Sequence, residues 1–256
     1  MNITALTEIA REAGQKIMEI YNSNNFDIEY KEDNSPLTKA DTASHSLIKE
    51  RLKNLAPEIP IISEEGKNVL YEQRKNWQEF WLVDPLDGTK EFIKRNGEFT
   101  VNIALIKNNK SVLGVIYAPA LDVIYFADSP NGAFKQMNGR PPEAIYTNSS
   151  SQDKLIAVQS RSHSSSAENE FLSRYSITES ISKGSSLKFC LVAEGKADIY
   201  YRSGPTWEWD TAAGQAILTI AGGKIMTGNK ELEYNKPTLK NDHGFACFAN
   251  KILLNM

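Results

Sequence analysis

The spacing of apolar residues changes along this chain from a helical period to a strand period, and this change constrains the fold more than any other feature. Over residues 3–20, apolar residues recur every three or four positions, which predicts an amphipathic helix. Between Thr100 and Phe134 apolar and polar residues alternate, and the turn-forming sequences KNNK, PALD and DSPNG divide the alternating runs. This pattern predicts an antiparallel meander of strands.

Between these two regions the sequence predicts a further helix and two strands. A second helical pattern carries Leu47 and Leu52 and ends before Pro57, and a short strand is expected over residues 59–63. After a charged loop, the apolar run FWLV is typical of a buried strand. This strand leads directly into the sequence DPLDGT at residues 84–89.

The stretch from Met137 to Lys154 is polar and rich in proline and serine, which favours a junction near residue 150. Beyond it, strand-like and helix-like segments alternate, and this alternation indicates layered packing of helices and strands. The alternating segments are 155–160, 185–195, 197–202 and 209–223. The predicted fold class is therefore α/β (α+β), with an N-terminal half of residues 1–150 and a C-terminal half of residues 151–256.

Composition and charge exclude several classes of protein. The 256 residues hold 29 Lys and Arg against 32 Asp and Glu, and this net charge of −3 argues against a protein that coats nucleic acid with a basic surface. Cys190 and Cys247 are the only cysteines, which excludes a disulfide framework and favours a reducing compartment. No run approaches the roughly 18 apolar residues of a membrane span, and the first residues lack a signal-peptide cleavage site. We expect a soluble protein of the cytoplasm.

Acidic residues stand where predicted strands end and predicted helices begin. Asp84 and Asp87 follow the buried strand directly, so the loop that leaves this strand can aim both carboxylates at one point. Carboxylates of this kind are hard oxygen ligands that suit Mg²⁺ together with phosphate oxygens and water. Glu64 follows another short strand and Asp210 precedes a predicted helix, so both are candidates to join the same site.

The residues after Asp87 suit the binding of a phosphate group. Gly88 lets the backbone approach a ligand because it has no Cβ atom. The amides of Gly88 and Thr89 can donate to a phosphate oxygen, and Thr89 adds a hydroxyl.

A purely structural interpretation exists for each of these acids. Asp41 and Asp210 can act as helix N-caps, an Asp-x-x-Asp-Gly sequence is a common turn, and Glu64-Glu65-Gly66 alone is typical of a solvated loop. However, several carboxylates gathered in one site raise each other's pKa unless a cation lies between them. Their clustering with no basic run nearby therefore favours a metal site.

Four motifs carry a resemblance to a known family, and they span about residues 5–225. They are SPLTKAD at residues 35–41, ISEEG at 62–66, DPLDGT at 84–89 and WDTAAG at 209–214. In type, order and separation they resemble the signatures of the lithium-sensitive metal phosphatases related to inositol monophosphatase. Three further stretches resemble the 3′(2′),5′-bisphosphate nucleotidase branch, namely SRSH at 160–163, GSSLKFC at 184–190 and GPT at 204–206.

This resemblance implies a fold and an activity. The fold would be the layered αβαβα sandwich of the inositol monophosphatase and fructose-bisphosphatase type, with residues 1–150 carrying the metal motifs and residues 151–256 closing the active site. The activity would be removal of the 3′-phosphate from adenosine 3′,5′-bisphosphate to give AMP. Two or three Mg²⁺ ions would activate a water molecule, and the biological role would lie in sulfur metabolism and nucleotide recycling.

The resemblance also implies roles for individual residues. The implied metal ligands are Glu64, Asp84, the carbonyl of Leu86, Asp87 and Asp210. The implied catalytic residues are Asp41, Thr89 and Glu64, with Asp41 orienting Thr89 so that the pair positions and deprotonates a metal-bound water. The implied substrate-binding residues are Glu64, Leu86, Asp87, Gly88, Thr89, His163, Ser185, Lys188, Arg202 and Asp210. Of these, His163, Ser185, Lys188 and Arg202 would contact the nucleotide and its second phosphate.

Several interpretations stay open from the sequence alone. His163 in the serine-rich run RSHSSS can be a surface residue, and Lys188 can be a lysine that extends along the surface to reach solvent. Tyr201 and Trp207 stand where the family pattern has a proline and a smaller residue, which leaves the fine substrate preference open. A phosphatase for inositol monophosphate or a sugar phosphate is the first alternative, and a catalytically silent binder of nucleotide or metal is the second.

The expected partner is a small-molecule nucleotide. A nucleic-acid partner is not expected, because the chain has neither a basic stripe nor an aromatic platform. The chain is expected to be a monomer or a homodimer without a transmembrane segment. We expect it in the cytoplasm, with peripheral association at the cytoplasmic face of the inner membrane as an alternative.

Overall fold

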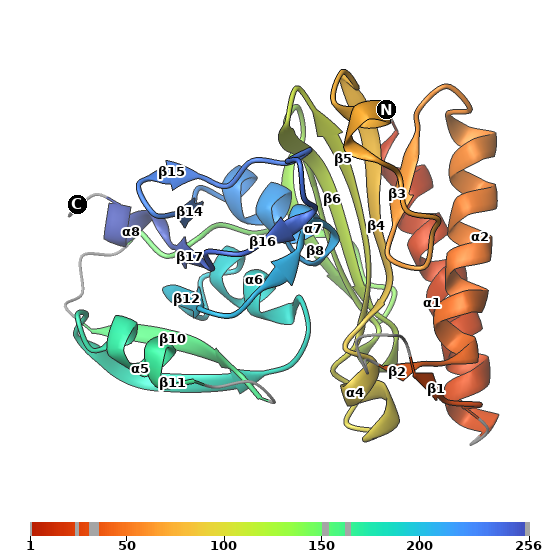
Figure 1. The fold of residues 1–256 in the computed structure, drawn as a ribbon. Helices are drawn as coiled ribbons and strands as arrows, with labels where there is room; N and C mark the ends of the chain where they lie inside the picture. Colours follow the sequence, from red (N-terminus) through yellow and green to blue (C-terminus); the bar gives the residue numbers. More distant parts are fainter. Residues whose placement is uncertain (1, 24–25, 31–35, 150–153, 162–164, 254–256) are drawn as a thin grey trace.

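The computed structural model describes residues 2–23, 26–30, 36–149, 154–161 and 165–253 (Figure 1). Within them lie a seven-stranded sheet in the order β3-β4-β5-β6-β7-β8-β9 and a six-stranded sheet in the order β11-β10-β12-β17-β14-β15. The strands of the first are β3 (Ile61–Ser63), β4 (Glu79–Asp87), β5 (Thr100–Lys107), β6 (Lys110–Ala118), β7 (Val123–Asp128), β8 (Gly132–Met137) and β9 (Glu143–Ala144). Those of the second are β10 (Leu155–Ser160), β11 (Ile177–Lys183), β12 (Ile199–Arg202), β14 (Lys224–Thr227), β15 (Lys230–Glu231) and β17 (Phe245–Phe248).

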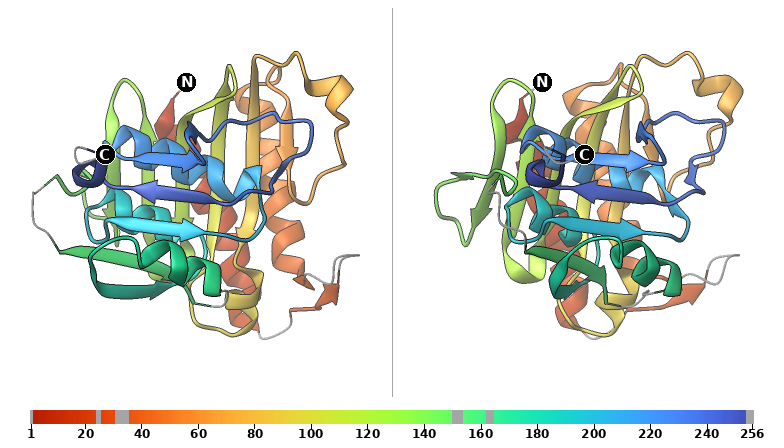
Figure 2. Two further views of the ribbon diagram at one scale, coloured as in Figure 1. Left: turned by 60° about the vertical axis from the view of Figure 1, so that its left-hand side comes forward. Right: turned by 90° about the vertical axis from the view of Figure 1, so that its left-hand side faces the viewer.

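Helices separate and cover these sheets, so that five layers alternate (Figures 1 and 2). The outer pair α1 (Ile3–Ser23) and α2 (Lys39–Leu55) packs on the seven-stranded sheet, and α6 (Leu187–Ala193) and α7 (Glu208–Ile220) fill the space between the sheets. Helix α5 (Ser166–Leu172) covers the outer face of the six-stranded sheet. The remaining short elements are β1 (Glu29–Tyr30), β2 (Pro36–Leu37), α3 (Tyr71–Arg74), α4 (Thr89–Ile93), the 3₁₀ turn Pro119–Leu121, β13 (Thr206–Trp207), β16 (Lys240–Asn241) and α8 (Asn250–Leu253). The α/β fold class predicted from the sequence is confirmed.

The two periodic regions fold as predicted. Helix α1 buries Leu6, Ile9, Ala13 and Ile17 against the sheet, which is the apolar stripe that its sequence shows. Strands β5 to β8 form the expected antiparallel meander. In the described part of the chain, no helix is both long and apolar enough to cross a membrane.

The central helix α7 is rich in small residues because it packs closely on both sides. A Cβ atom at Gly214 would lie 2.4 Å from the ring of Phe189, and one at Gly114 of β6 would lie 2.5 Å from the carbonyl oxygen of Ala213. Larger side chains at these positions would push α7 away from its neighbours. This close packing fixes the first turn of α7 relative to the seven-stranded sheet.

The second half was predicted less completely than the first. Strands β11, β14 and β17 were not predicted, and β11 is mostly exposed, with no apolar alternation to reveal it. The junction expected near residue 150 falls among residues 150–153, outside the described residues. The division of the chain into residues 1–150 and 151–256 stays a prediction.

Candidate active site

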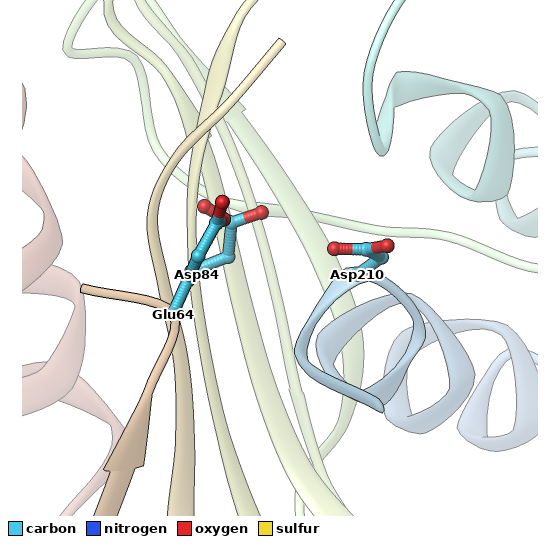
Figure 3. Close-up of side chains that lie close together, drawn as sticks. All are labelled: Glu64, Asp84 and Asp210. Carbon is cyan, nitrogen blue, oxygen red and sulfur yellow. The ribbon is translucent and has the colours of Figure 1, made fainter. Parts of the chain in front are cut away.

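Three carboxylates meet between the seven-stranded sheet and the first turn of helix α7 (Figure 3). Glu64, Asp84 and Asp210 each offer an oxygen atom, and these oxygens lie within 4.8 Å of one another. Strands β3 and β4 pair in parallel with Ser63 opposite Val83, so the next residues of the two strands, Glu64 and Asp84, become neighbours. Asp210 comes from the first turn of α7. The grouping anticipated from the sequence is therefore present for these three acids.

The electrostatics of this group require a positive charge. Asp84 is 1% exposed, and burial raises its pKa well above the usual range, with further increases from the charges of Glu64, Asp87 and Asp210. Burial also raises the pKa of Asp210, and Asp87 and Glu64 add to this effect. Ionised carboxylates so close together and so poorly hydrated are unstable without a cation. The acidic group therefore suits a bound metal ion.

Strand β4 is longer than the sequence predicted. The DPLD sequence was expected to be a loop after the strand, but β4 continues to Asp87, which pairs with Thr100 of β5. The pairing is irregular between Asp84 and Asp87. Because of this irregularity, both carboxylates can serve the same site from a paired and rigid strand.

Asp87 is held differently from the other acids. Its Oδ2 atom accepts hydrogen bonds from the hydroxyls of Ser185 at 2.8 Å and Ser186 at 2.6 Å. The close group of carboxylates among the described residues consists of Glu64, Asp84 and Asp210 and does not include Asp87. Its role as a metal ligand stays a prediction.

The predicted pair of Asp41 and Thr89 is in contact. The hydroxyl of Thr89 donates to Oδ1 of Asp41 at 3.2 Å and lies 3.4 Å from the carbonyl oxygen of Leu86. Gly88, which precedes helix α4, has a positive φ of 91°, a conformation that glycine adopts without strain. A side chain there would also crowd Ser185, whose Cβ atom would lie 3.3 Å from the added Cβ.

The capping alternative for Asp41 and Asp210 is wrong in detail. Neither is the N-cap residue, because Thr38 caps α2 and Trp207 precedes α7. Asp41 lies three residues after Thr38 and accepts a hydrogen bond from the Thr38 amide at 2.8 Å. Asp210 likewise lies three residues after Trp207 and accepts from the Trp207 amide at 2.7 Å. A role in the helix start and a role in the site therefore coexist in each residue.

The carboxylates of Glu64, Asp84, Asp87 and Asp210 line a cavity of about 350 Å³. Residues from both sides of position 150 contribute to its lining. Lys188 lines it and is only 6% exposed, and its ammonium group donates to the carbonyl oxygen of Ser185 at 2.5 Å. Burial lowers the pKa of this lysine. The alternative that Lys188 extends along the surface to solvent is wrong.

The other predicted nucleotide contacts lie in different surroundings. Arg202 also lines the cavity, and its guanidinium lies 3.6 Å from a carboxylate oxygen of Glu168. Ser185 lines the cavity as well. His163 lies outside the described residues.

Other cavity residues were not among the predicted site residues, although Thr206 and Trp207 stand in or beside stretches that the sequence analysis singled out. Tyr200, Thr206, Trp207, Phe245 and Ser186 all line the cavity. Ser186 is next to Ser185 in the GSSLKFC stretch, so the motif could have pointed to it. Phe245 lies on β17, which was not predicted as a strand, and the pairing of β17 with β12 and β14 brings it to the site.

Comparison with known proteins agrees with this geometry. The family model described as "Inositol monophosphatase family" matches residues 2–254. The chain is 49% identical over 239 residues to the 3′(2′),5′-bisphosphate nucleotidase CysQ of Salmonella typhimurium, a match that covers 89% of this chain and 91% of that protein. It is 47% identical over 238 residues to CysQ of Escherichia coli K12, with the same coverage of 89% and 91%.

The solved structures include a similar protein. The crystal structure of CysQ from Bacteroides thetaiotaomicron, a bacterial member of the inositol monophosphatase family, superposes with a TM-score of 0.85 at 43% identity. This superposition covers 97% of each chain. The chain belongs to the inositol monophosphatase family.

Proposed function

We propose that this protein is a Mg²⁺-dependent phosphatase that removes the 3′-phosphate from adenosine 3′,5′-bisphosphate to give AMP. One observation carries the proposal: an acidic group and two largely buried cationic side chains, Lys188 and Arg202, line the same cavity. The acids suit a metal ion, and the cations suit a second anionic group on the substrate. The printed names of the similar CysQ proteins support the same substrate class.

The acids fit Mg²⁺ because they offer only hard oxygen ligands and because their charges raise the pKa values of Asp84 and Asp210. The residues that would hold the ions, two or three per site, are Glu64, Asp84, the carbonyl of Leu86, Asp87 and Asp210. When bound, Mg²⁺ would supply Lewis-acid activation of water and neutralisation of the charge that develops on the phosphate oxygens.

The protein groups around the phosphate would orient the reaction and move the proton. Oγ1 of Thr89 would accept a proton from the attacking water as its own proton passes to Oδ1 of Asp41, its hydrogen-bond partner at 3.2 Å. Glu64 would help to orient the same water. The amides of Gly88 and Thr89 would hold the phosphate that is removed.

Lys188 and Arg202 would bind the phosphate that remains on the product. An arginine guanidinium can hold two oxygens of a phosphate at once, and a lysine ammonium adds a single strong charge. Both side chains are largely buried, so little solvent screens their attraction to the substrate. Ser185 and His163 are proposed to contact the nucleotide as well.

The decisive experiment measures phosphate release from adenosine 3′,5′-bisphosphate with Mg²⁺, with and without Li⁺, beside inositol 1-phosphate and a sugar phosphate. We expect rapid release from the bisphosphate, none without Mg²⁺, and inhibition by Li⁺. A preference for inositol 1-phosphate or the sugar phosphate would establish the first alternative. Binding of the nucleotide without release from any substrate would establish a silent binder. A role in sulfur metabolism would follow from the expected result, because adenosine 3′,5′-bisphosphate is a by-product of sulfate activation and transfer.

A further inference from the structure

Two hydroxyls from a distant part of the chain hold the carboxylate of Asp87. All of its hydrogen bonds in the described residues fall on one oxygen atom, Oδ2. The two shortest come from Ser185 at 2.8 Å and from Ser186 at 2.6 Å, which directly precede α6. These bonds leave Oδ1 as the oxygen of Asp87 that is available to a ligand.

Strand β5 fixes the direction of the Ser186 hydroxyl. The side-chain amide of Asn102 donates to Oγ of Ser186 at 2.8 Å. Because an amide nitrogen can only donate, the hydroxyl accepts from Asn102 and its own proton is free to point at Asp87. Asn102 is held in turn, since Thr100 lies two residues earlier on the same face of β5 and donates to Oδ1 of Asn102 at 2.9 Å. Thr100, Asn102 and Ser186 are each no more than 1% exposed, so water does not replace these contacts.

A second contact fixes the backbone just before the two serines. The carboxylate of Glu98 accepts from the amide of Gly184 at 2.8 Å. Arg161 donates twice to the same carboxylate, at 2.8 and 2.9 Å, and Lys183 lies 3.1 Å from it. Ser185 then adopts a positive φ of 53°, which a serine accepts only when its surroundings require it. The segment 184–186 is therefore held at both ends against the loop and strand that follow α4.

We propose that Ser186, oriented by Asn102, is a positioning residue that reserves Oδ1 of Asp87 for a divalent cation. A carboxylate with one oxygen saturated by hydrogen bonds can offer only the other to a metal, and such bonds fix its rotation as well. The cation at Asp87 would thus depend on a hydroxyl about 100 residues further along the chain. This inference rests on the proposed function only in assuming that Asp87 meets a cation.

The test is a calorimetric titration of the metal-free protein with Mn²⁺ in the absence of substrate, comparing the wild type with Ser186→Ala. Loss of a group that orients a metal ligand typically weakens metal affinity by about 10–100-fold. We expect a loss of this size for one class of Mn²⁺ site, while a class that depends on Glu64 and Asp84 keeps its affinity. Asp87→Asn should weaken the same class at least as much.

Ser111→Ala is the matched control. Ser111 is half-buried, and its hydroxyl donates at 2.7 Å to the carbonyl oxygen of Ala212 rather than to a carboxylate. Its replacement should leave every Mn²⁺ affinity unchanged. If Ser186→Ala does not fold, as judged by circular dichroism, Ser186→Cys replaces it, because the thiol keeps the shape and is a weak donor.

The outcomes separate this inference from the proposed function. A folded Ser186 variant that binds Mn²⁺ like the wild type overturns the positioning role. A wild type that binds no Mn²⁺ overturns the inference and the proposed function together. If Ser186→Ala weakens Mn²⁺ binding as expected but the wild type releases no phosphate from any substrate, then the positioning role is supported and only the proposed activity is overturned.

Discussion

Asp84 and Glu98 are both buried carboxylates, with 1% and 6% of their surfaces exposed, yet their surroundings are opposite. Burial and the charges of other carboxylates, with Glu64 the strongest, raise the pKa of Asp84. Burial alone would also raise the pKa of Glu98, but hydrogen bonds from Arg161, Gly184 and Lys183 outweigh it and lower the pKa. The same chemical group is destabilised in one place and stabilised in the other.

This difference distinguishes a carboxylate that stabilises the fold, Glu98, from one that belongs to the candidate active site, Asp84. The chain supplies the cations that Glu98 needs, so Glu98 holds the segment 184–186 in place whether or not a ligand is present. The charged groups that act on the pKa of Asp84 are carboxylates, so we propose that a bound cation supplies the balancing charge there. The cost in stability of gathering these acids is therefore a sign that the region serves binding and catalysis.

Replacement of Asp84 by asparagine should have the largest effect, because it removes the destabilised carboxylate of this pair. We expect Asp84→Asn to lower the rate of phosphate release at least about 10³-fold at saturating Mg²⁺, because the change removes a proposed principal metal ligand. The same change should raise, or leave unchanged, the melting temperature of the metal-free protein, because it removes a charge that the fold disfavours. Enzyme assay and thermal unfolding in EDTA measure the two effects.

Asp198→Asn is the matched control for this prediction. Asp198 is also 1% exposed, but it is satisfied by the amide of Ile156 at 2.7 Å and by Asn148 at 3.2 Å. Its replacement should lower the melting temperature and leave Mg²⁺-dependent catalysis nearly intact in the folded fraction. A wild-type rate in Asp84→Asn would contradict the assignment of Asp84 as a ligand.

Replacement of Arg202 tests whether the cationic side chains of the cavity bind the substrate, in contrast to the cationic side chains around Glu98, which stabilise the fold. We expect Arg202→Ala to raise KM for adenosine 3′,5′-bisphosphate by about 10–100-fold, the size of one or two charge-assisted hydrogen bonds. KM for a nucleotide with only the 3′-phosphate should change little. Lys188→Ala should act in the same direction, and equal effects on both substrates would contradict the assignment to the second phosphate.

Part of this comparison could be predicted from the sequence, and part could not. Helix α1 and strands β5 to β8 were predictable because a buried face repeats locally with a fixed period. Glu64, Asp84 and Asp210 were predictable because each stands in a short motif beside a strand or helix end. Strand β17 was not predictable, since its four buried residues take their place only by pairing with β12 and β14.

The contacts of Glu98 and Ser186 were also beyond the sequence. Glu98 meets Arg161 across 63 positions, and Ser186 meets Asp87 across 99 positions. No local pattern records such a contact, because it depends on how the two sheets come together. Sequence therefore identified residues that carry the chemistry more readily than those that hold them in position.

Replacement of Glu98 provides the complementary test, because Glu98 is the stabilised carboxylate of the pair. Glu98→Gln keeps the size of the side chain but removes the charge that Arg161 and Lys183 balance. We expect a loss of about 1–3 kcal/mol in the free energy of unfolding, because a buried hydrogen-bonded network loses its acceptor charge. Urea denaturation in EDTA measures it, and the loss should persist with Mg²⁺. An unchanged free energy of unfolding would contradict the framework role.

The pH dependence of stability is the smallest effect, and it should run in opposite directions for the two carboxylates. The pKa of Asp84 in the folded protein lies above its ordinary value of 3.8. At pH values between the ordinary pKa and this raised pKa, the folded state therefore binds more protons than the unfolded state. The stability of the metal-free protein therefore falls as the pH rises through this range. The pKa of Glu98 is below its ordinary value of 4.5, so its contribution is present above that value and is lost as the pH falls through the lowered pKa.

Differences between variants isolate these two contributions from all other titrating groups. In EDTA, the advantage of Asp84→Asn over the wild type should be greatest near about pH 8 and should shrink as the pH falls and Asp84 takes up its proton. The deficit of Glu98→Gln should stay constant from about pH 8 to 5 and close only at more acidic pH. Saturating Mg²⁺ should abolish or reverse the first difference and leave the second unchanged, because only Asp84 takes its balancing charge from solution. If the two differences instead follow the same course with pH, then the contrast between the two carboxylates is wrong.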